Sequence, residues 1–132
     1  MTKESLVQGV DFICIPTQDF DKAKDFYEDV LGLEMSKRWG DMPAGEFESG
    51  DLTVAVMQSD AFGLEFKRHS LPISFRVADV AAARSTLEEK GVEFDGEIID
   101  SGVCHQSIFH DPDGNTLNLH HRYAPPGAKP GN

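Results

Sequence analysis

The chain contains one sequence pattern twice, and this repeat constrains its fold more than any other feature. The stretch FICIPTQDFDKAKDFYEDVLGLEM at residues 12–35 is matched by PISFRVADVAAARSTLEEKGVEF at residues 72–94, and Asp19 and Asp79 are sixty positions apart. Each copy predicts a strand, a helix and a second strand. Repeated units of this size bury a core only by packing against one another. We therefore expect two similar halves, with the hollow between them as the first place to find a ligand.

Apolar periodicity and turn residues give the same order of elements in both halves. In the first half we expect a helix from Asp19 to the residue before Gly32, and strands at residues 10–17, 33–39, 44–48 and 52–58. In the second half we expect a helix at residues 79–90 and strands at residues 73–78, 92–99, 103–110 and 115–122. The predicted order is βαβββ, used twice.

The length of 132 residues fits one domain with one core. We expect an N-terminal extension (1–9), a domain at residues 10–123 and a flexible tail (124–132). Within the domain we expect a first module (10–58), a linker (59–71) and a second module (72–123).

The composition narrows the possible partners and the location. A net charge of −11 disfavours nucleic acids and anionic membranes, both of which need a basic surface. No apolar run approaches the roughly 20 residues that span a bilayer. Only Cys14 and Cys104 are cysteines, and the N-terminal residues lack the profile of a secretory signal. We expect a cytoplasmic protein that binds a small neutral or cationic molecule.

The turns of two hairpins predict which side chains share a face of a sheet. A turn at residues 111–114 places His105 opposite His120 and Ser107 opposite Asn118, all on the concave side of the sheet. A tight turn in ESGD places Glu46 opposite Thr53, also on the concave side. A shift of one residue in a pairing would exchange the two faces of a strand.

Strand alternation extends this predicted cavity wall to the first strand and beyond. Cys104 falls on the apolar face opposite His105, where a thiol is a packing residue rather than a nucleophile. The full predicted wall consists of His105, His120, Asn118, Ser107, Glu46, Thr53, Phe12 and Cys14, with Trp39 and Met57 as further candidates.

Three motifs in order, DFDKAKDFYEDVLGLEM, ISFRVADVAAARSTLEEKGVEF and FHDPDGNTLNL, resemble the vicinal oxygen chelate superfamily over residues 10–123. This superfamily includes glyoxalase I, extradiol dioxygenases, fosfomycin-resistance enzymes and bleomycin-resistance proteins. The resemblance implies an α+β fold of paired βαβββ modules, with curled mixed sheets that enclose a cavity, and commonly a homodimer. Because the superfamily contains catalysts and binding proteins, it does not select a reaction.

The resemblance also implies metal ligands on the first and last strands of each module. These positions fall on Phe12, Pro72 and Asn118, and on Thr53 or Ala55. Phenylalanine, proline and alanine side chains donate no electron pair, and asparagine is a neutral, weak ligand. We therefore predict that the usual metal site is absent.

Three functions remain open, and whether the chain is an enzyme is one of the open points. The first is a metal-free module that binds a small, partly aromatic or cationic molecule, as bleomycin-resistance proteins do. The second is a metal-dependent enzyme of the glyoxalase or dioxygenase type, with Zn, Ni or Fe held at a relocated site by His105, His120 and Glu46. The third is acid–base chemistry by the same three residues without a metal.

Overall fold

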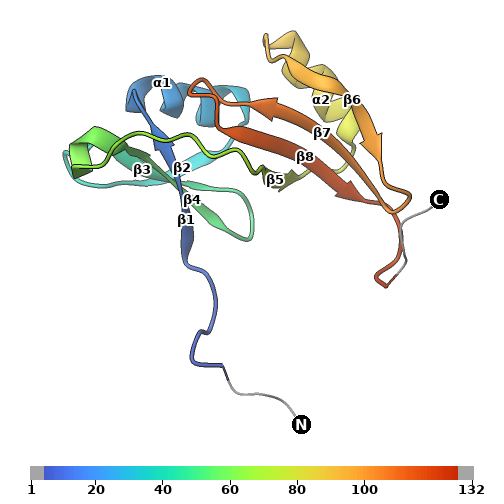
Figure 1. The fold of residues 1–132 in the computed structure, drawn as a ribbon, viewed down its shortest axis with the longest axis horizontal. Helices are drawn as coiled ribbons and strands as arrows, with labels where there is room; N and C mark the ends of the chain where they lie inside the picture. The colour runs from blue at the N-terminus through green and yellow to red at the C-terminus, as the bar shows by residue number, and fades with distance from the viewer. Residues whose placement is uncertain (1–4, 128–132) are drawn as a thin grey trace.

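The strands form two four-stranded mixed sheets, one from each half of the sequence (Figure 1). The computed structural model describes residues 5–127. The first sheet has the order β1-β4-β3-β2 and the second the order β5-β8-β7-β6. In each sheet the first and last strands of the module pair in parallel, and neither sheet closes into a barrel. The strands are β1 (Phe12–Thr17), β2 (Glu34–Arg38), β3 (Ala44–Glu48), β4 (Thr53–Gln58), β5 (Ile73–Arg76), β6 (Phe94–Asp100), β7 (Cys104–His110) and β8 (Thr116–Arg122). The predicted βαβββ repeat is confirmed.

The two principal helices begin where the sequence predicts. The carboxylates of Asp19 and Asp79 accept hydrogen bonds from the backbone N–H groups of Lys22 and Ala82, which caps both helices. Gly32 has a φ of 77°, in the left-handed region that ends many helices. The helical segments are α1 (Phe20–Asp25), the π-helical turn η1 (Phe26–Val30), the short 3-10 helix η2 (Ser59–Phe62) and α2 (Val80–Glu89).

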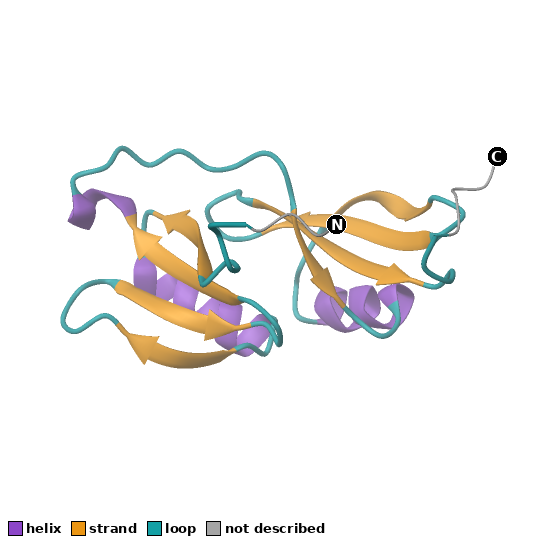
Figure 2. Cartoon of the chain, turned by 90° about the horizontal axis from the view of Figure 1, so that it is seen from below, coloured by secondary structure: helices purple, strands orange, loops and turns teal. Residues whose placement is uncertain are grey.

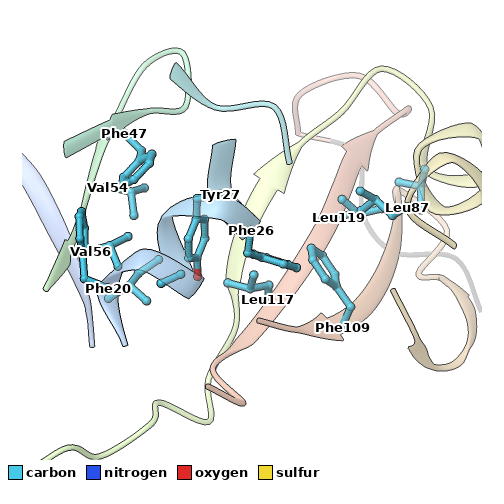
Figure 3. Close-up of a cluster of buried hydrophobic side chains, with 13 residues drawn as sticks. Phe20, Phe26, Tyr27, Phe47, Val54, Val56, Leu87, Phe109, Leu117 and Leu119 are labelled. Atoms are coloured by element: carbon cyan, nitrogen blue, oxygen red, sulfur yellow. The ribbon is translucent and has the colours of Figure 1, made fainter. Parts of the chain in front are cut away.

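Each module has its principal helix, α1 or α2, on one face of its sheet, and neither of these helices lies on the other face (Figure 2). We call these the helix face and the open face. The buried apolar side chains of the two helix faces form one cluster (Figure 3), with Tyr27 from the first module and Phe109 and Leu117 from the second. All three are 0% exposed. The two modules therefore share their apolar core.

A buried polar junction fastens the loop after β7 to the first module. The hydroxyl of Tyr27 donates to Oδ2 of Asp111 at 2.6 Å, and Nδ2 of Asn115 donates to the carbonyl of Pro16 at 2.8 Å. Burial, and then the charge of Asp111, raise the pKa of Tyr27 well above its usual value. The phenol therefore keeps its proton and acts as a donor to Asp111.

The pairing of β7 with β8 differs from the prediction by one residue. His105 lies opposite His121, not His120, and Asn118 lies opposite Ile108 rather than Ser107. A shift of one residue in the pairing moves every side chain of a strand to the opposite face of the sheet. His105 and Ser107 therefore lie on the helix face and not on the predicted concave side. The predicted face of β8 is correct, since Asn118 and His120 lie on the open face.

The reason for this shift is that Asn115 belongs to the loop and not to β8. The N–H of Asp111 donates to the carbonyl of Asn115 at 3.0 Å, and the Asn115 side chain bonds to Pro16 of the first module. These contacts lengthen the loop from four residues to five. The contact with Pro16 joins residues 99 positions apart, so local turn chemistry does not reveal it.

The pairing of β3 with β4 differs from the prediction by two residues. Glu46 lies opposite Ala55 and not Thr53, because the connection is a four-residue loop closed by a hydrogen bond from the N–H of Ser49 to the carbonyl of Leu52 at 3.2 Å. A shift of two residues leaves each side chain on its predicted face. Glu46 and Thr53 therefore share the open face.

The ends of the chain and the linker complete the description. The predicted linker at residues 59–71 begins with η2 and then runs without a strand to β5. Part of the predicted N-terminal extension, residues 1–4, and part of the predicted tail, residues 128–132, lie outside the described residues. No helix in the described part of the chain is long and apolar enough to cross a membrane.

Candidate functional site

The open face of the first sheet carries the predicted side chains of β1 and β4. Phe12 pairs with Thr53 and Cys14 with Ala55, and the parallel pairing places each pair on one face. Met57 shares this face, two residues after Ala55. The structure thus brings together the side chains that the sequence predicted for this wall, and neither α1 nor α2 lies on this face.

Three aromatic rings from separate segments meet on this face, and we call them the aromatic floor: Phe12, Trp39 and Phe62. The ring centroids of Phe12 and Trp39 are 5.9 Å apart at 77°, and those of Trp39 and Phe62 are 6.2 Å apart at 85°. Both contacts are edge-to-face, the geometry that aromatic quadrupoles favour. Phe12 is 43% exposed, so the floor is accessible from solvent.

Glu46 fixes the indole of Trp39 in this cluster. The Nε1–H of Trp39 donates to Oε2 of Glu46 at 2.6 Å. The hydrogen bond holds the indole plane, and it places a carboxylate at the edge of the Trp39 ring, one of the three rings of the floor. An aromatic surface next to a negative charge attracts organic cations through cation–π and Coulomb interactions.

A small hollow of about 110 Å³ adjoins the aromatic floor. Cys14, Met57, Phe62 and Leu64 are among the residues that line it. Burial raises the pKa of the Cys14 thiol, which therefore stays protonated near neutral pH and is a weak nucleophile. Cys14 and Met57 thus form walls of this hollow, which lies between the first sheet and the linker and not between the two modules, where the sequence predicted the cavity.

Phe62 and Leu64 were not predicted as site residues. They belong to the linker, which reaches the open face through η2. The only sequence signal was the apolar content of the segment AFGLEF, which stands out in a linker. Thr53, in contrast, was predicted for the wall but donates its hydroxyl to Glu48 at 2.7 Å.

The open face of the second sheet is polar. Asn118 is 0% exposed, and its amide Nδ2 donates to Oγ of Ser74 and to Oε1 of Gln106, each at 2.9 Å. Its Oδ1 accepts the N–H of Ser107 at 3.1 Å. Both ends of the Asn118 amide are therefore used within the protein. His120 lies on the same face, opposite Gln106.

Three predicted positions on β7 need correction. Ser107 is 0% exposed on the helix face, where its hydroxyl accepts a hydrogen bond from Nη1 of Arg84 at 3.2 Å. His105 lies on the same face and packs against Tyr123, with ring centroids 4.7 Å apart and the rings inclined at 37°. Cys104 points to the opposite side from His105, although the sequence placed it on the apolar face. It is nevertheless buried.

The structure does not bring His105, His120 and Glu46 together. His105 and His120 lie on opposite faces of the second sheet, and Glu46 lies on the first sheet, bonded to Trp39. The sequence left open a relocated metal site and an acid–base group, and both hypotheses required these three side chains to lie close together. Neither group of three forms within this chain.

A sequence profile of the Glyoxalase/Bleomycin resistance protein/Dioxygenase superfamily matches residues 9–119, and the chain therefore belongs to this superfamily. The predicted family is confirmed. The chain is 28% identical over 114 residues to the uncharacterized protein YraH of Bacillus subtilis (strain 168), in an alignment that covers 77% of this chain and 89% of that protein.

Solved structures share the fold over most of their length. TnmS3, an antibiotic binding protein from Streptomyces sp. CB03234, superposes with a TM-score of 0.74 at 25% identity, covering 90% of this chain and 99% of that one. A lactoylglutathione lyase from Agrobacterium tumefaciens superposes with a TM-score of 0.70 at 17% identity, covering 88% of this chain and 95% of that one. The second likeness concerns the fold alone.

The side chains at the metal-ligand positions of the superfamily do not fit a divalent ion. On the first sheet these positions hold the ring of Phe12 and the paired Thr53, whose hydroxyl is bonded to Glu48. On the second sheet Asn118 is 0% exposed, its Nδ2 donates to Ser74 and Gln106, and its neutral Oδ1 already accepts the N–H of Ser107.

Proposed function

We propose that this protein binds a small aromatic cation on the open face of the first sheet, against the aromatic floor. The observation that carries the proposal is the hydrogen bond of 2.6 Å from Trp39 to Glu46. It holds the indole in place before a ligand arrives, so binding costs little ordering of the site. The floor supplies ring faces and edges for stacking, and Glu46 supplies the opposite charge.

Two further observations support a binding function with a cationic ligand. The net charge of −11 attracts cations and repels anions over distances up to about a Debye length. The antibiotic binding protein TnmS3 shares the fold and 25% of its aligned residues with this chain. A protein of this fold can therefore serve to hold a small molecule.

We also propose that a second copy of the chain covers the ligand, as a homodimer. Apart from η2, no helix of the described chain lies on the open face of either sheet, and Phe12 is 43% exposed, so the aromatic floor has an accessible side. A covered floor would remove the ligand from water and strengthen its contact with Glu46. Light scattering after gel filtration should give twice the chain mass of 14.5 kDa; a single chain mass at all concentrations tested would contradict the dimer.

Trp39→Ala should abolish most of the affinity for a planar aromatic cation. Using thioflavin T as the probe in a fluorescence titration, we expect a loss of at least tenfold, or about 1.4 kcal/mol. Glu46→Gln keeps the size of the side chain and should weaken thioflavin T several-fold, while binding of the aromatic anion anilinonaphthalene sulfonate should not weaken. A loss of affinity for the cation without a loss for the anion would show that the charge of Glu46 contributes to binding.

Ile99→Ala is the matched control for these titrations, because Ile99 is a half-exposed residue of the second sheet, away from the floor. It should bind thioflavin T as the unmodified chain does. The proposal is wrong if the unmodified chain does not bind the probe, or if Trp39→Ala binds it with unchanged affinity.

A further inference from the structure

Two histidines lie directly opposite each other on the helix face of the second sheet. His105 of β7 and His121 of β8 are partners in the antiparallel ladder. Side chains at directly opposite positions of such a ladder have Cβ atoms about 4.5–5.5 Å apart. Both imidazoles line a hollow of about 400 Å³ at the start of α2, with Asp79, Ile98 and Tyr123. The strand ends that carry them lie beside the C-terminal end of the described chain (Figure 1).

The ring of His121 is oriented by the backbone. Its Nδ1 lies 3.1 Å from the carbonyl oxygen of Val77. Because a carbonyl oxygen only accepts, Nδ1 carries the proton, and Nε2 of the neutral ring keeps its lone pair. A backbone carbonyl that holds one ring nitrogen is the usual outer support of a histidine that ligates a metal through the other.

The ring of His105 is held by two neighbours. It packs against Tyr123, with ring centroids 4.7 Å apart, and its Nε2 lies 3.4 Å from Oδ2 of Asp100. The hydroxyl of Tyr123 donates to Oδ1 of Asp100 at 2.7 Å, so the carboxylate is fixed as well. The carboxylate faces Nε2 of His105 and leaves Nδ1 for a ligand.

We propose that His105 and His121 together bind one divalent transition-metal ion that prefers imidazole nitrogen, of the class Ni²⁺, Cu²⁺ and Zn²⁺. Their paired positions in the ladder bring the two imidazoles within reach of one ion, and water completes its coordination. Residues 5–127 contain no group of three or more His, Cys, Asp and Glu side chains at metal-binding distances, so the proposal rests on this pair. The carboxylate of Asp100 adds favourable charge beside it.

This site is separate from the aromatic floor and from the ligand positions of the superfamily. It lies on the helix face of the second sheet, whereas Asn118 and His120 lie on the open face. The proposal therefore does not depend on the proposed binding of an aromatic cation. The two can fail independently.

Calorimetric titration of the untagged full chain with Ni²⁺ tests the site, at a pH about one unit above the ordinary imidazole pKa of about 6.5. We expect one equivalent to bind, and His105→Ala and His121→Ala each to weaken binding at least tenfold. His120→Ala and His110→Ala are matched controls and should bind within twofold of the unmodified chain. His120 is the neighbour on the other face, and His110 is on the same strand but paired with Asp95 at 2.7 Å.

A second measurement on the unmodified chain covers the case in which a variant does not fold. In NMR spectra, substoichiometric Cu²⁺ should broaden the imidazole signals of His105 and His121 before those of His69, His110 and His120. The proposal is overturned if the unmodified chain takes up no Ni²⁺, if a folded His105→Ala or His121→Ala variant binds as before, or if the other three histidines broaden first.

Discussion

Asp111→Ala is expected to destabilise the folded chain by about 3–5 kcal/mol, which is a large part of the stability of an ordinary domain. Asp111 is 6% exposed and accepts four hydrogen bonds. The donors are the Tyr27 hydroxyl at 2.6 Å, Nδ2 of Asn115 at 2.8 Å, and the N–H groups of Asn115 and Asp113 at 2.9 Å. Removing the carboxylate leaves buried donors without a partner, and each such donor is costly.

Urea denaturation followed by circular dichroism measures this effect. Tyr27→Phe removes a single donor and should cost about 1–2 kcal/mol, much less than Asp111→Ala. Asp95→Ala is a surface control, because Asp95 forms an exposed pair with His110, and it should change stability by less than about 1 kcal/mol. Equal losses for Asp111→Ala and Asp95→Ala would show that the junction does not stabilise the fold.

Phe109→Ala should cost about 3–5 kcal/mol, because it removes a fully buried ring and leaves a cavity. Phe109 is 0% exposed, and its ring centroid lies 5.1 Å from that of Phe94. It also belongs to the cluster that includes Phe26 of the first module (Figure 3). Because the cluster spans both modules, the loss should lower the stability of both in one transition.

Thermal unfolding, recorded separately by tryptophan fluorescence and circular dichroism, tests whether the modules unfold together. Trp39 is the only tryptophan and reports on the first module, although Phe109 lies in the second. Both signals of Phe109→Ala should shift down by the same amount. A shift in circular dichroism without a shift in tryptophan fluorescence would contradict a shared core. Ile99→Ala, half exposed on β6, should shift neither by much.

The order and type of the elements could be predicted from the sequence, because they depend on local patterns. The apolar stripe and the capping residues Asp19 and Asp79 are contained within each helix, and both helices begin where these residues predict. The alternation along β1 and β4 placed Phe12, Cys14 and Met57 on the correct face. The repeat in the sequence predicted that the two halves of the chain have the same order of elements, and they do.

The contents of the site depended on contacts that no local pattern contains. Glu46 and Trp39 were each predicted for the cavity wall, but their hydrogen bond follows from the course of the chain between β2 and β3. Phe62 reaches the floor because η2 turns the linker toward the open face. The predicted face of β7 was wrong because Asn115 belongs to the loop and not to β8, where its side chain donates a hydrogen bond to Pro16 of the first module.

The length of the loop at residues 111–115 determines which side chains of β7 lie on the open face of the second sheet. Deleting one loop residue would turn β7 over and present His105 and Ser107 where Gln106 and Ile108 now lie. The same change would also move Phe109, which is 0% exposed in the shared core, to the other face of the sheet. A single deletion could thus exchange an amide and an alkyl group for an imidazole and a hydroxyl, so relatives with loops of different length are the natural place to seek different ligand preferences on one scaffold.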